Sequence, residues 1–355
     1  MKVNARFRDM LLSILIAVTL GLAASASLLL FLGKNPIAAY GLLAASVIRD
    51  GYTFADIFVK ATPLMLTGLA FAFTYKANLY NIGAQGQFYI GAIVATAMSL
   101  FLGARLPGPL SLLIVFVATI AAGGLWGSFV GFAKARFRSN EFLISMMSTY
   151  VALAAMNYLL RTALIETKHE YPQTNPFTPG LWLPILVNGT RLHAGFILAV
   201  LIALLVWLLL FRTPLGYRIR AVGYNADAAR LAGIDSGRIS IATFFIAGTL
   251  AAAAGFTETN GVQHMLVQGF NPNIGAEGIG IAILADANPV GIIFASILIG
   301  ALKVGGAIMG QRSGIPASII DIMEGFVMVF VILSSFVRSG LETRRAKRIL
   351  RSRTK

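Results

Sequence analysis

The hexapeptide NIGAQG at residues 81–86 returns as NIGAEG at residues 273–278, and only Gln85 and Glu277 differ. Each copy joins a polar asparagine to two glycines, and each lies beyond an apolar segment. Glycine permits backbone conformations and close approaches that a side chain forbids. The repeat therefore indicates two related halves, each with a break in its apolar pattern at a matching position.

The composition places these halves in a membrane. Of the 355 residues, 57% are hydrophobic and 12% are charged, and the mean hydropathy is +0.79. A soluble domain carries about 25% charged residues. The chain has no cysteine, which excludes disulfides and thiolate metal sites, and its three histidines are scattered. We predict neither a metal site nor a catalytic cluster.

Ten segments are apolar enough to be interpreted as membrane spans. They are residues 10–33, 61–75, 88–104, 106–133, 142–160, 192–211, 239–257, 274–285, 288–302 and 315–337. The second and the eighth are short and interrupted. The first is interpreted as a span rather than a cleaved signal peptide, because its apolar run is longer than a usual signal-peptide core.

The positions of lysine and arginine orient these spans. With the N-terminus in the cytoplasm, most of the 29 basic residues fall in cytoplasmic segments. The net charge of +15 then faces anionic lipid headgroups, and nucleic acid is not an expected partner. We predict an all-α membrane protein of about ten transmembrane helices, with both termini cytoplasmic. Residues 1–337 form a single transmembrane domain, and residues 338–355 form a basic tail.

Two halves of five spans must have opposite orientations, because five is odd. Many transporters build their pathway from inverted repeats with short, glycine-interrupted segments at matching positions. We therefore expect both hexapeptides to be broken or re-entrant helix starts facing a pathway, the first at the cytoplasmic side and the second at the external side. The pathway candidates are Asn81, Gln85, Gln87, Asn140, Glu141, Asn273 and Glu277. Helix capping is the alternative role for Asn140 and Glu141.

The longest cytoplasmic connection is RTPLGYRIRAVGYNADAARLAGIDSGR at residues 212–238. Asn225 is a good N-cap, residues 226–231 favour a helix, and Gly233 is placed to end it. A capped helix in a connection indicates a docking element, and a helix lying on the headgroups is the alternative. The chain has no phosphate-binding loop, so an ATPase docking here is another polypeptide.

Three charged residues fall within the last two spans. Asp321 and Glu324 are three residues apart and share a helix face, and Lys303 lies in the preceding span. We expect Lys303 to pair with one or both acids, which either fastens the two helices together or lines the pathway. Spans with so few basic residues suit a neutral polar solute, such as a nucleoside or a sugar.

Several stretches resemble bacterial ABC-transporter permeases of the branched-chain amino acid, ribose and nucleoside type. The loop at 212–238 resembles their coupling-loop signature. Further similar stretches are NIGAQGQF at 81–88, AKARFRSNEFLISMM at 133–147, GIAILADANPVGI at 280–292 and RSGIPASIIDIMEGFVM at 312–328. The pattern is most similar to the longer permease of nucleoside uptake systems. Gln85 departs from it, because the family usually has glutamate there, and ADAN at 285–288 replaces small residues.

The resemblance implies a multi-pass subunit of an ATP-driven importer in the bacterial cytoplasmic (inner) membrane. Implied partners are a second, shorter permease in a heterodimer, an ATPase with two fused cassettes that binds ATP and Mg, and an extracellular substrate-binding lipoprotein. This chain itself would hold no cofactor and would not be an enzyme. The residues that match the signature for coupling to the ATPase are Thr213, Gly216, Arg220, Gly223, Asn225, Ala228, Ala229 and Gly233.

Nucleosides are the expected substrates, and ribose or another neutral sugar is the alternative within the same family. An alternative from another class is an ion-coupled secondary carrier, with proton sites at Glu258, Glu277 or Lys303. The coupling loop distinguishes the two classes, because a carrier has no need of it.

Overall fold

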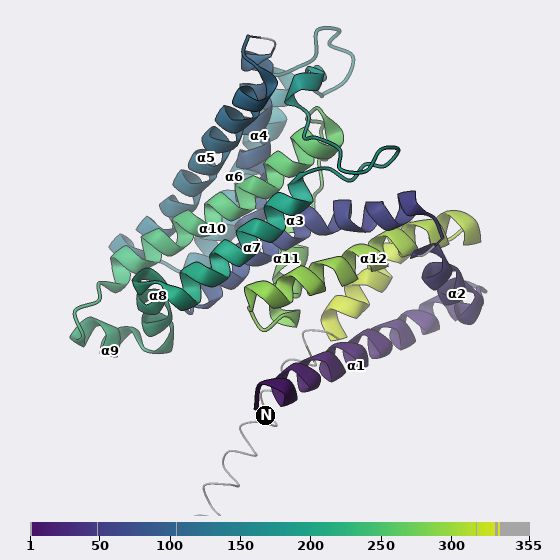
Figure 1. The fold of residues 1–355 in the computed structure, drawn as a ribbon, viewed down its shortest axis with the longest axis horizontal. Coiled ribbons are helices and arrows are strands. Elements are labelled where there is room, and N and C mark those ends of the chain that lie inside the picture. The colour runs from purple at the N-terminus through teal and green to yellow at the C-terminus, as the bar shows by residue number, and fades with distance from the viewer. Residues whose placement is uncertain (1, 48, 104, 317, 331–332, 334–355) are drawn as a thin grey trace, which may run out of the picture. The chain divides into compact units, whose positions relative to one another are not determined.

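The computed structural model describes residues 2–47, 49–103, 105–316, 318–330 and 333, which form helices joined by loops (Figure 1). Within this described part, extended backbone pairs only at two isolated bridges, Gln173 with Val267 and Ile185 with His193. The predicted all-α class is therefore confirmed. The chain divides into two compact units, Met1–Thr53 with Ala301–Lys355, and Phe54–Gly300.

The smaller unit contains α1 (Lys2–Phe31), α2 (Pro36–Val47) and a helix over residues 318–330. Its core is formed by buried apolar side chains from these helices and their connections, namely Leu29, Ala39, Met309, Ile315, Ile320 and Met323. The sequence does not predict α2, because its 12 residues are too few to span a bilayer. Asn35 nevertheless marks its start, since the Asn35 side chain accepts a hydrogen bond from Ile37 N at 2.9 Å.

The larger unit carries both hexapeptides and the predicted coupling loop. Its helices are α3 (Gly51–Tyr75, starting in the smaller unit), α4 (Ala84–Leu102), α5 (Gly108–Phe137), α6 (Glu141–Arg161), α7 (Gly195–Arg212), α8 (Pro214–Tyr224), α9 (Ala226–Leu231), α10 (Ser236–Glu258), α11 (Ile274–Leu284) and α12 (Pro289–Ser313, ending in the smaller unit). A 3-10 turn lies at Pro179–Leu181, and a π-helical turn at Thr259–Gln263 extends α10.

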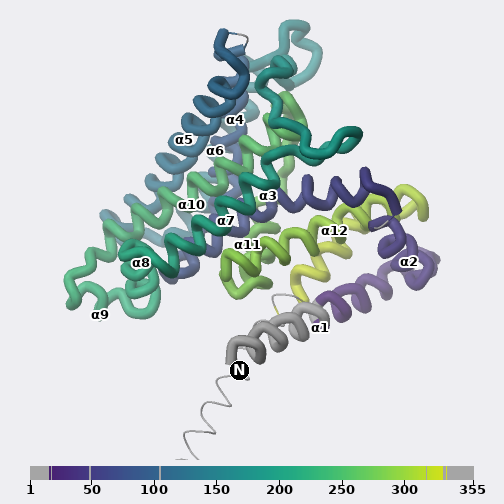
Figure 2. The backbone as a smooth tube through the Cα atoms, in the orientation of Figure 1, coloured from purple at the N-terminus to yellow at the C-terminus, as the bar shows by residue number. Residues whose placement is uncertain are grey.

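Helices α4, α5, α6 and α10 pack side by side in this unit (Figure 2). Glycines allow α5 and α10 to approach each other closely. A side chain at Gly127 would overlap the carbonyl of Phe244, and one at Gly248 would overlap the carbonyl of Gly123. Small residues at helix contacts are typical of membrane proteins, because close backbone packing replaces the hydrophobic effect there.

Seven helices in the described residues are long and apolar enough to cross a membrane, namely α3 to α7, α10 with its π-helical turn, and α12. The prediction of a short, interrupted span at 61–75 is wrong, because α3 is a continuous helix of 25 residues. Pro63 is accommodated inside α3. The charged side chain of Lys60 is exposed, so the charge does not have to be buried within α3. Neither Pro63 nor Lys60 therefore ends the helix.

The apolar segment predicted at 274–285 is a short helix, as expected, because α11 has only 11 residues. Such a helix is about 16 Å long, roughly half of the ~30 Å hydrocarbon core. The tenth predicted span, 315–337, is described as helix over residues 318–330. The rest of that span beyond residue 333 and the basic tail at 338–355 lie outside the described residues.

Candidate functional site

The two repeated hexapeptides touch each other. The Gln85 side chain donates a hydrogen bond from Nε2 to the carbonyl of Asn271 at 2.9 Å and accepts one at Oε1 from Gly275 N at 2.5 Å. Gly275 lies so close to Gln85 that a Cβ atom there would overlap the Gln85 backbone. The prediction that the hexapeptides lie at opposite sides of the membrane is therefore wrong.

The path of residues 264–273 explains this contact. The segment is irregular, and its Phe270 ring stacks on Phe88 of α4 with the ring centroids 5.2 Å apart. The chain thus runs along α4 before α11 begins at Ile274, beside the start of α4 at Ala84. Both hexapeptides are helix starts, as predicted. The second lies next to the first because the irregular segment runs along α4 and the helix that follows it, α11, is short.

The first hexapeptide is fully packed. The amides of Asn81 and Gln87 exchange two hydrogen bonds, at 2.8 and 3.2 Å, and both side chains are buried. Cβ atoms at Gly83 and Gly86 would meet the backbone of α6 at 2.7 Å. Buried amides need partners, and here each supplies the other. In this conformation the pair stabilises the start of α4 from within.

The second hexapeptide is more open. Asn273 is exposed, and Glu277 is half-buried. Nearby on α10, Glu258 is only 4% exposed and lies beside the side chains of Asn271 and Gln263. Polar and ionisable groups within apolar helices are costly and mark functional sites. The region around Gln85, Asn271, Glu258 and Glu277 is therefore the buried polar site of the larger unit.

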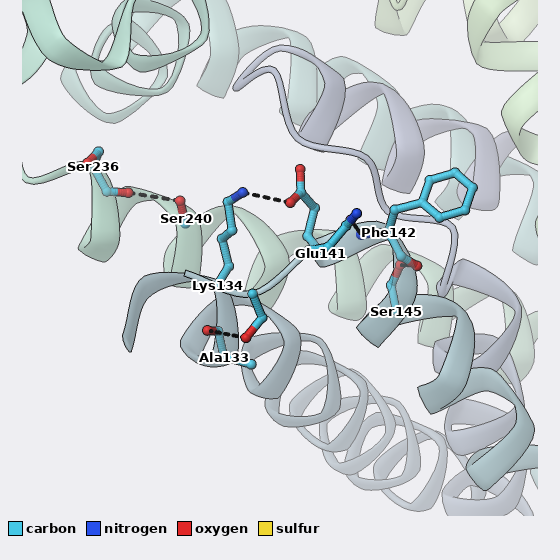
Figure 3. Close-up of polar contacts among 9 residues, drawn as sticks. Ala133, Lys134, Glu141, Phe142, Ser145, Ser236 and Ser240 are labelled. Carbon is cyan, nitrogen blue, oxygen red and sulfur yellow. Dashed lines mark hydrogen bonds and ion pairs between the residues drawn. The ribbon is translucent and has the colours of Figure 1, made fainter. Parts of the chain in front are cut away.

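Asn140 and Glu141 lie where the turn after α5 leads into α6. The Asn140 side chain caps α6 by accepting a hydrogen bond from Phe142 N at 3.0 Å. Glu141 forms an ion pair with Lys134 of α5, with Oε2 and Nζ 2.7 Å apart (Figure 3). Both residues therefore have local partners at the end of the helices.

The predicted coupling loop contains two helices rather than one. The unpredicted α8 begins at Pro214, and the Thr213 hydroxyl caps it by accepting a hydrogen bond from Gly216 N at 3.1 Å. A capping threonine followed by proline is a helix-start signal that the sequence already contains. Near its other end, a Cβ at Gly223 would overlap the carbonyl of Lys76, so α8 rests directly on the end of α3.

The second helix of the loop, α9, has the predicted boundaries. The Asn225 side chain accepts hydrogen bonds from the backbone N–H groups of Asp227 and Ala228, both at 3.0 Å. Gly233 has a φ of +80° just past the helix, as the predicted end requires. The other signature residues differ in burial: Ala229 is buried, Ala228 is exposed, and Arg220 lies over the Phe211 ring.

A cavity of about 790 Å³ lies between this loop and the neighbouring turns. It is bordered by the α3–α4 connection, by the α5–α6 turn of Figure 3 and by both ends of α9. Its charged and polar lining includes Asn78, Lys134, Arg138, Glu141, Arg230 and Asp235. The fold thus gathers at one end three segments that are far apart in the sequence and that the sequence predicts to be cytoplasmic.

The opposite end of the larger unit is closed by loops that bond to one another. The Asn260 side chain donates hydrogen bonds to Ser99 Oγ and to the carbonyl of Leu181, at 2.9 and 3.0 Å. His193 is 1% exposed and accepts a hydrogen bond from Gly195 N at Nδ1. Burial lowers the pKa of His193 to about 4, and His264 and Arg191 add to the shift. The sequence gives no signal for this arrangement.

The predicted charge cluster lies in the smaller unit. Lys303 Nζ and Glu324 Oε2 are 2.9 Å apart, and their side chains are 24% and 22% exposed. The predicted pairing of Lys303 with an acid of the last helix is confirmed. Asp321 is exposed.

Comparison with known proteins finds relatives along nearly the whole chain. The family model described as branched-chain amino acid transport system, permease component, matches residues 53–332. The guanosine ABC transporter permease NupP of Bacillus subtilis is 33% identical over 91% of this chain and 93% of its own length. The glucose ABC transporter permease TsgB13 of Haloferax volcanii is 31% identical over 91% and 87%. The nucleoside ABC transporter permease NupB of Lactococcus lactis is 28% identical over 94% and 93%.

Two of these organisms have a second similar permease. The guanosine permease NupQ of Bacillus subtilis and the nucleoside permease NupC of Lactococcus lactis are each 26% identical, over 79% and 81% of this chain. No solved structure gives a significant match. The match over residues 53–332 and the similarity to NupP along both full chains show that this multi-pass membrane protein belongs to the family of permease components of branched-chain amino acid transport systems.

Proposed function

We propose that the chain is the membrane-spanning permease subunit of an ATP-driven importer that takes up nucleosides. The observation that carries this proposal is the α8–α9 loop. Its two capped helices leave Tyr224 90% exposed and Leu231 92% exposed. Large apolar side chains exposed outside the membrane spans mark a surface for a protein partner. The nucleoside and guanosine permeases similar to this chain support the substrate class.

Contacts between loops support the predicted orientation, with cytoplasmic termini and about ten spans in two inverted halves. Lys76 Nζ donates to the carbonyl of Asp286 at 3.1 Å, and both residues are predicted to be cytoplasmic. Arg161 donates to Gln268 Oε1 at 3.3 Å, and both are predicted to be external. The basic loop residues then face the cytoplasm of a bacterial cell, as the charge rule for the inner membrane requires.

The proposed partners follow from this placement. An ATPase subunit, with ATP and Mg bound in it and not in this chain, docks at the cavity end beside α8 and α9. A second, similar permease completes the membrane pore, which the paired relatives in Bacillus subtilis and Lactococcus lactis support. A substrate-binding lipoprotein delivers the nucleoside from outside.

The pathway lies along the second hexapeptide. Irregular backbone at membrane depth is tolerated only where protein buries it or where it lines water. In the irregular segment before α11, Gln268, Gly269, Pro272 and Asn273 are exposed, although Phe270 beside them is buried against α4. We infer that this exposed edge, Asn273, Glu277 and the adjoining Gln85 line the pathway.

One observation favours a second substrate class. The glucose permease of Haloferax volcanii is about as similar to this chain as the guanosine permease of Bacillus subtilis. Both solutes are neutral and rich in hydroxyl groups, so a pathway lined with amides suits either. An ion-coupled carrier would use the buried Glu258 and Glu277 as proton sites, but it would leave the capped coupling loop without a role.

Uptake by the complete system tests the proposal. The chain, expressed together with the proposed ATPase, second permease and binding protein, should accumulate guanosine in preference to glucose or ribose, and only with ATP. The purified chain alone should hydrolyse no ATP. Specific ATP hydrolysis by this polypeptide alone, or uptake driven by a proton gradient without the ATPase, would contradict the importer. Preferential uptake of a sugar would contradict the nucleoside assignment alone.

A further inference from the structure

We propose that α11 is a movable gate and that Gln85 is the positioning residue that holds it against α4. This inference rests on the proposed transport function, because it assumes a pathway along the second hexapeptide. Three features carry it: α11 has hinge-like residues at both ends, polar side chains bond to both of its ends, and an ionised carboxylate at position 85 could not make the two observed hydrogen bonds.

Helix α11 is flanked by residues in an unusual backbone conformation. Before it, Asn271 has a φ of +38°, and after it, Asp286 and Ala287 have φ values of +53° and +49°. Residues with side chains rarely adopt positive φ, and such conformations concentrate at switching segments. Hinges are typically a few residues at the ends of an element that absorb the change in backbone angles. The short helix thus has a candidate hinge on each side.

The start of α11 is fastened by Gln85. Its amide bonds to Asn271 and Gly275 on either side of the helix start, and the Thr67 hydroxyl of α3 lies 3.2 Å from the carbonyl of Ile274. The N-terminal end of α11 is therefore held on α3 and α4 by side chains rather than by a continuous helix. Release of the Gln85 amide would remove two of these three hydrogen bonds beside the exposed Asn273 and leave the bond from Thr67.

The other end of α11 is fastened beneath the coupling loop. Lys76 donates a hydrogen bond to the carbonyl of Asp286 in the turn that follows the helix. Gly223 of α8 packs against the carbonyl of the same Lys76, so closely that a Cβ atom at Gly223 would overlap it. A displacement of α8 therefore reaches the end of α11 through one residue. This arrangement gives the docking loop a physical connection to the proposed gate.

The two hydrogen bonds of Gln85 require an amide. The amide offers a donor for the Asn271 carbonyl and an acceptor for Gly275 N–H at the same time. An ionised carboxylate has acceptors only, so it would face the Asn271 carbonyl without a proton. A protonated carboxyl group could make both bonds.

The surroundings reinforce this requirement. Tyr89 on α4 lies beside Gln85, Glu277 on α11 lies two residues after Gly275, and Glu258 on α10 lies beside Asn271, with Lys60 of α3 as the basic residue of this region. Two of these groups are acids. A carboxylate introduced at position 85 would be repelled by them and would lose its proton less readily. The bridge would then depend on pH, whereas the native amide bridge does not.

A cysteine label can report the position of α11 directly, because the chain has no cysteine of its own. Ala276 is exposed on the first turn of α11, so Ala276→Cys places a single thiol on the proposed gate. The complete transporter in membrane vesicles is labelled with a fluorescent maleimide between about pH 5.5 and about pH 8.5. Thiol reactivity itself rises with pH, so each rate is divided by that of free glutathione measured at the same pH.

With Gln85 present, the normalised rate should stay low at every pH. With Gln85→Glu it should start low and rise about tenfold as the carboxyl group loses its proton, which is the effect of leaving one buried hydrogen bond unmade. Gln85→Met, which can make neither bond, should label fast at every pH. Recovery of the assembled complex from each variant shows that it is folded.

Equal rates for all three residues at position 85, at every pH, would overturn the gate. The measurement needs no substrate, so it separates this inference from the proposed function. If guanosine is taken up but the labelling rate does not depend on the residue at position 85, the gate is refuted and the proposed function stands. The expected labelling pattern in a transporter that takes up no nucleoside refutes the proposed substrate and keeps the gate.

Discussion

The two ends of the larger unit are built in different ways (Figure 1). At the end with the 3-10 turn at Pro179–Leu181, loops distant in sequence bond to each other, as Thr174 N does to the carbonyl of Leu266 at 2.9 Å, and they bury His193. At the other end, α9 is capped by its own Asn225, and Leu231 is almost fully exposed. At the first end, the closed end, the loops find their packing partners within the chain. The second leaves apolar surface for a partner.

The largest effect is expected from Gly223→Val at the open end. A side chain there overlaps the Lys76 carbonyl and must displace α8. Guanosine uptake and ATPase co-purification should fall to background, while membrane insertion stays normal because no spanning helix is touched. The matched control is Gly41→Val, since a Cβ at Gly41 meets no atom within 4 Å. Normal uptake and assembly by the Gly223 variant would show that the open end is not the docking end.

The second largest effect is expected from breaking the ion pair between Lys303 and Glu324. Lys303→Met leaves Glu324 without its ion pair between apolar helices. Loss of one partner of a buried pair costs about 3–5 kcal/mol, whereas replacing both is often neutral. Thermal unfolding in detergent should therefore show a large loss of stability for Lys303→Met and a recovery with Lys303→Met plus Glu324→Gln. A double variant no more stable than the single one would refute the pairing.

Local signals in the sequence were enough for the open end. An asparagine before residues 226–231 and a glycine after them predict α9, because caps act within a few residues. The pairing of Lys303 with an acid followed from helix periodicity in the same way. The sequence also contains a local signal for α8 that the prediction of a single helix did not use: the capping Thr213 is followed directly by Pro214.

The contact between the hexapeptides was beyond local signals. It depends on the irregular path of residues 264–273 along α4, which is decided by packing such as that of Phe270 on Phe88. The continuity of α3 through Pro63 is likewise a tertiary effect, since neighbouring helices stabilise a helix that its own sequence weakens. The sequence thus singled out Gln85 and Glu277, but it gave no signal for Asn271 or for how these residues meet.

The free energy of unfolding should depend on pH because of His193 at the closed end. His193 has a pKa of about 4 in the folded chain, because it is buried, against about 6.5 when unfolded. The folded state binds fewer protons between these values, so its stabilisation is complete above about pH 6.5 and is lost as the pH falls towards 4. The total loss is about 3 kcal/mol. The unfolding temperature should fall less between about pH 7.5 and about pH 5 in His193→Gln than in the native chain. Equal slopes would contradict a buried, neutral His193.

The smallest effect should come from the cap of α9. Asn225→Ala removes the side chain that accepts hydrogen bonds from Asp227 N and Ala228 N, which costs about 1 kcal/mol. A helix of six residues has little stability of its own, so this loss should unfold α9 in a large fraction of molecules. Substrate-stimulated ATP hydrolysis by the assembled complex should drop about fivefold. Asn225→Asp is the matched control, because a carboxylate caps equally well and should keep normal activity. If Asn225→Ala and Asn225→Asp are both as active as the native complex, the folded helix is not what the ATPase recognises. The contrast between a closed and a docking end would then rest on α8 alone.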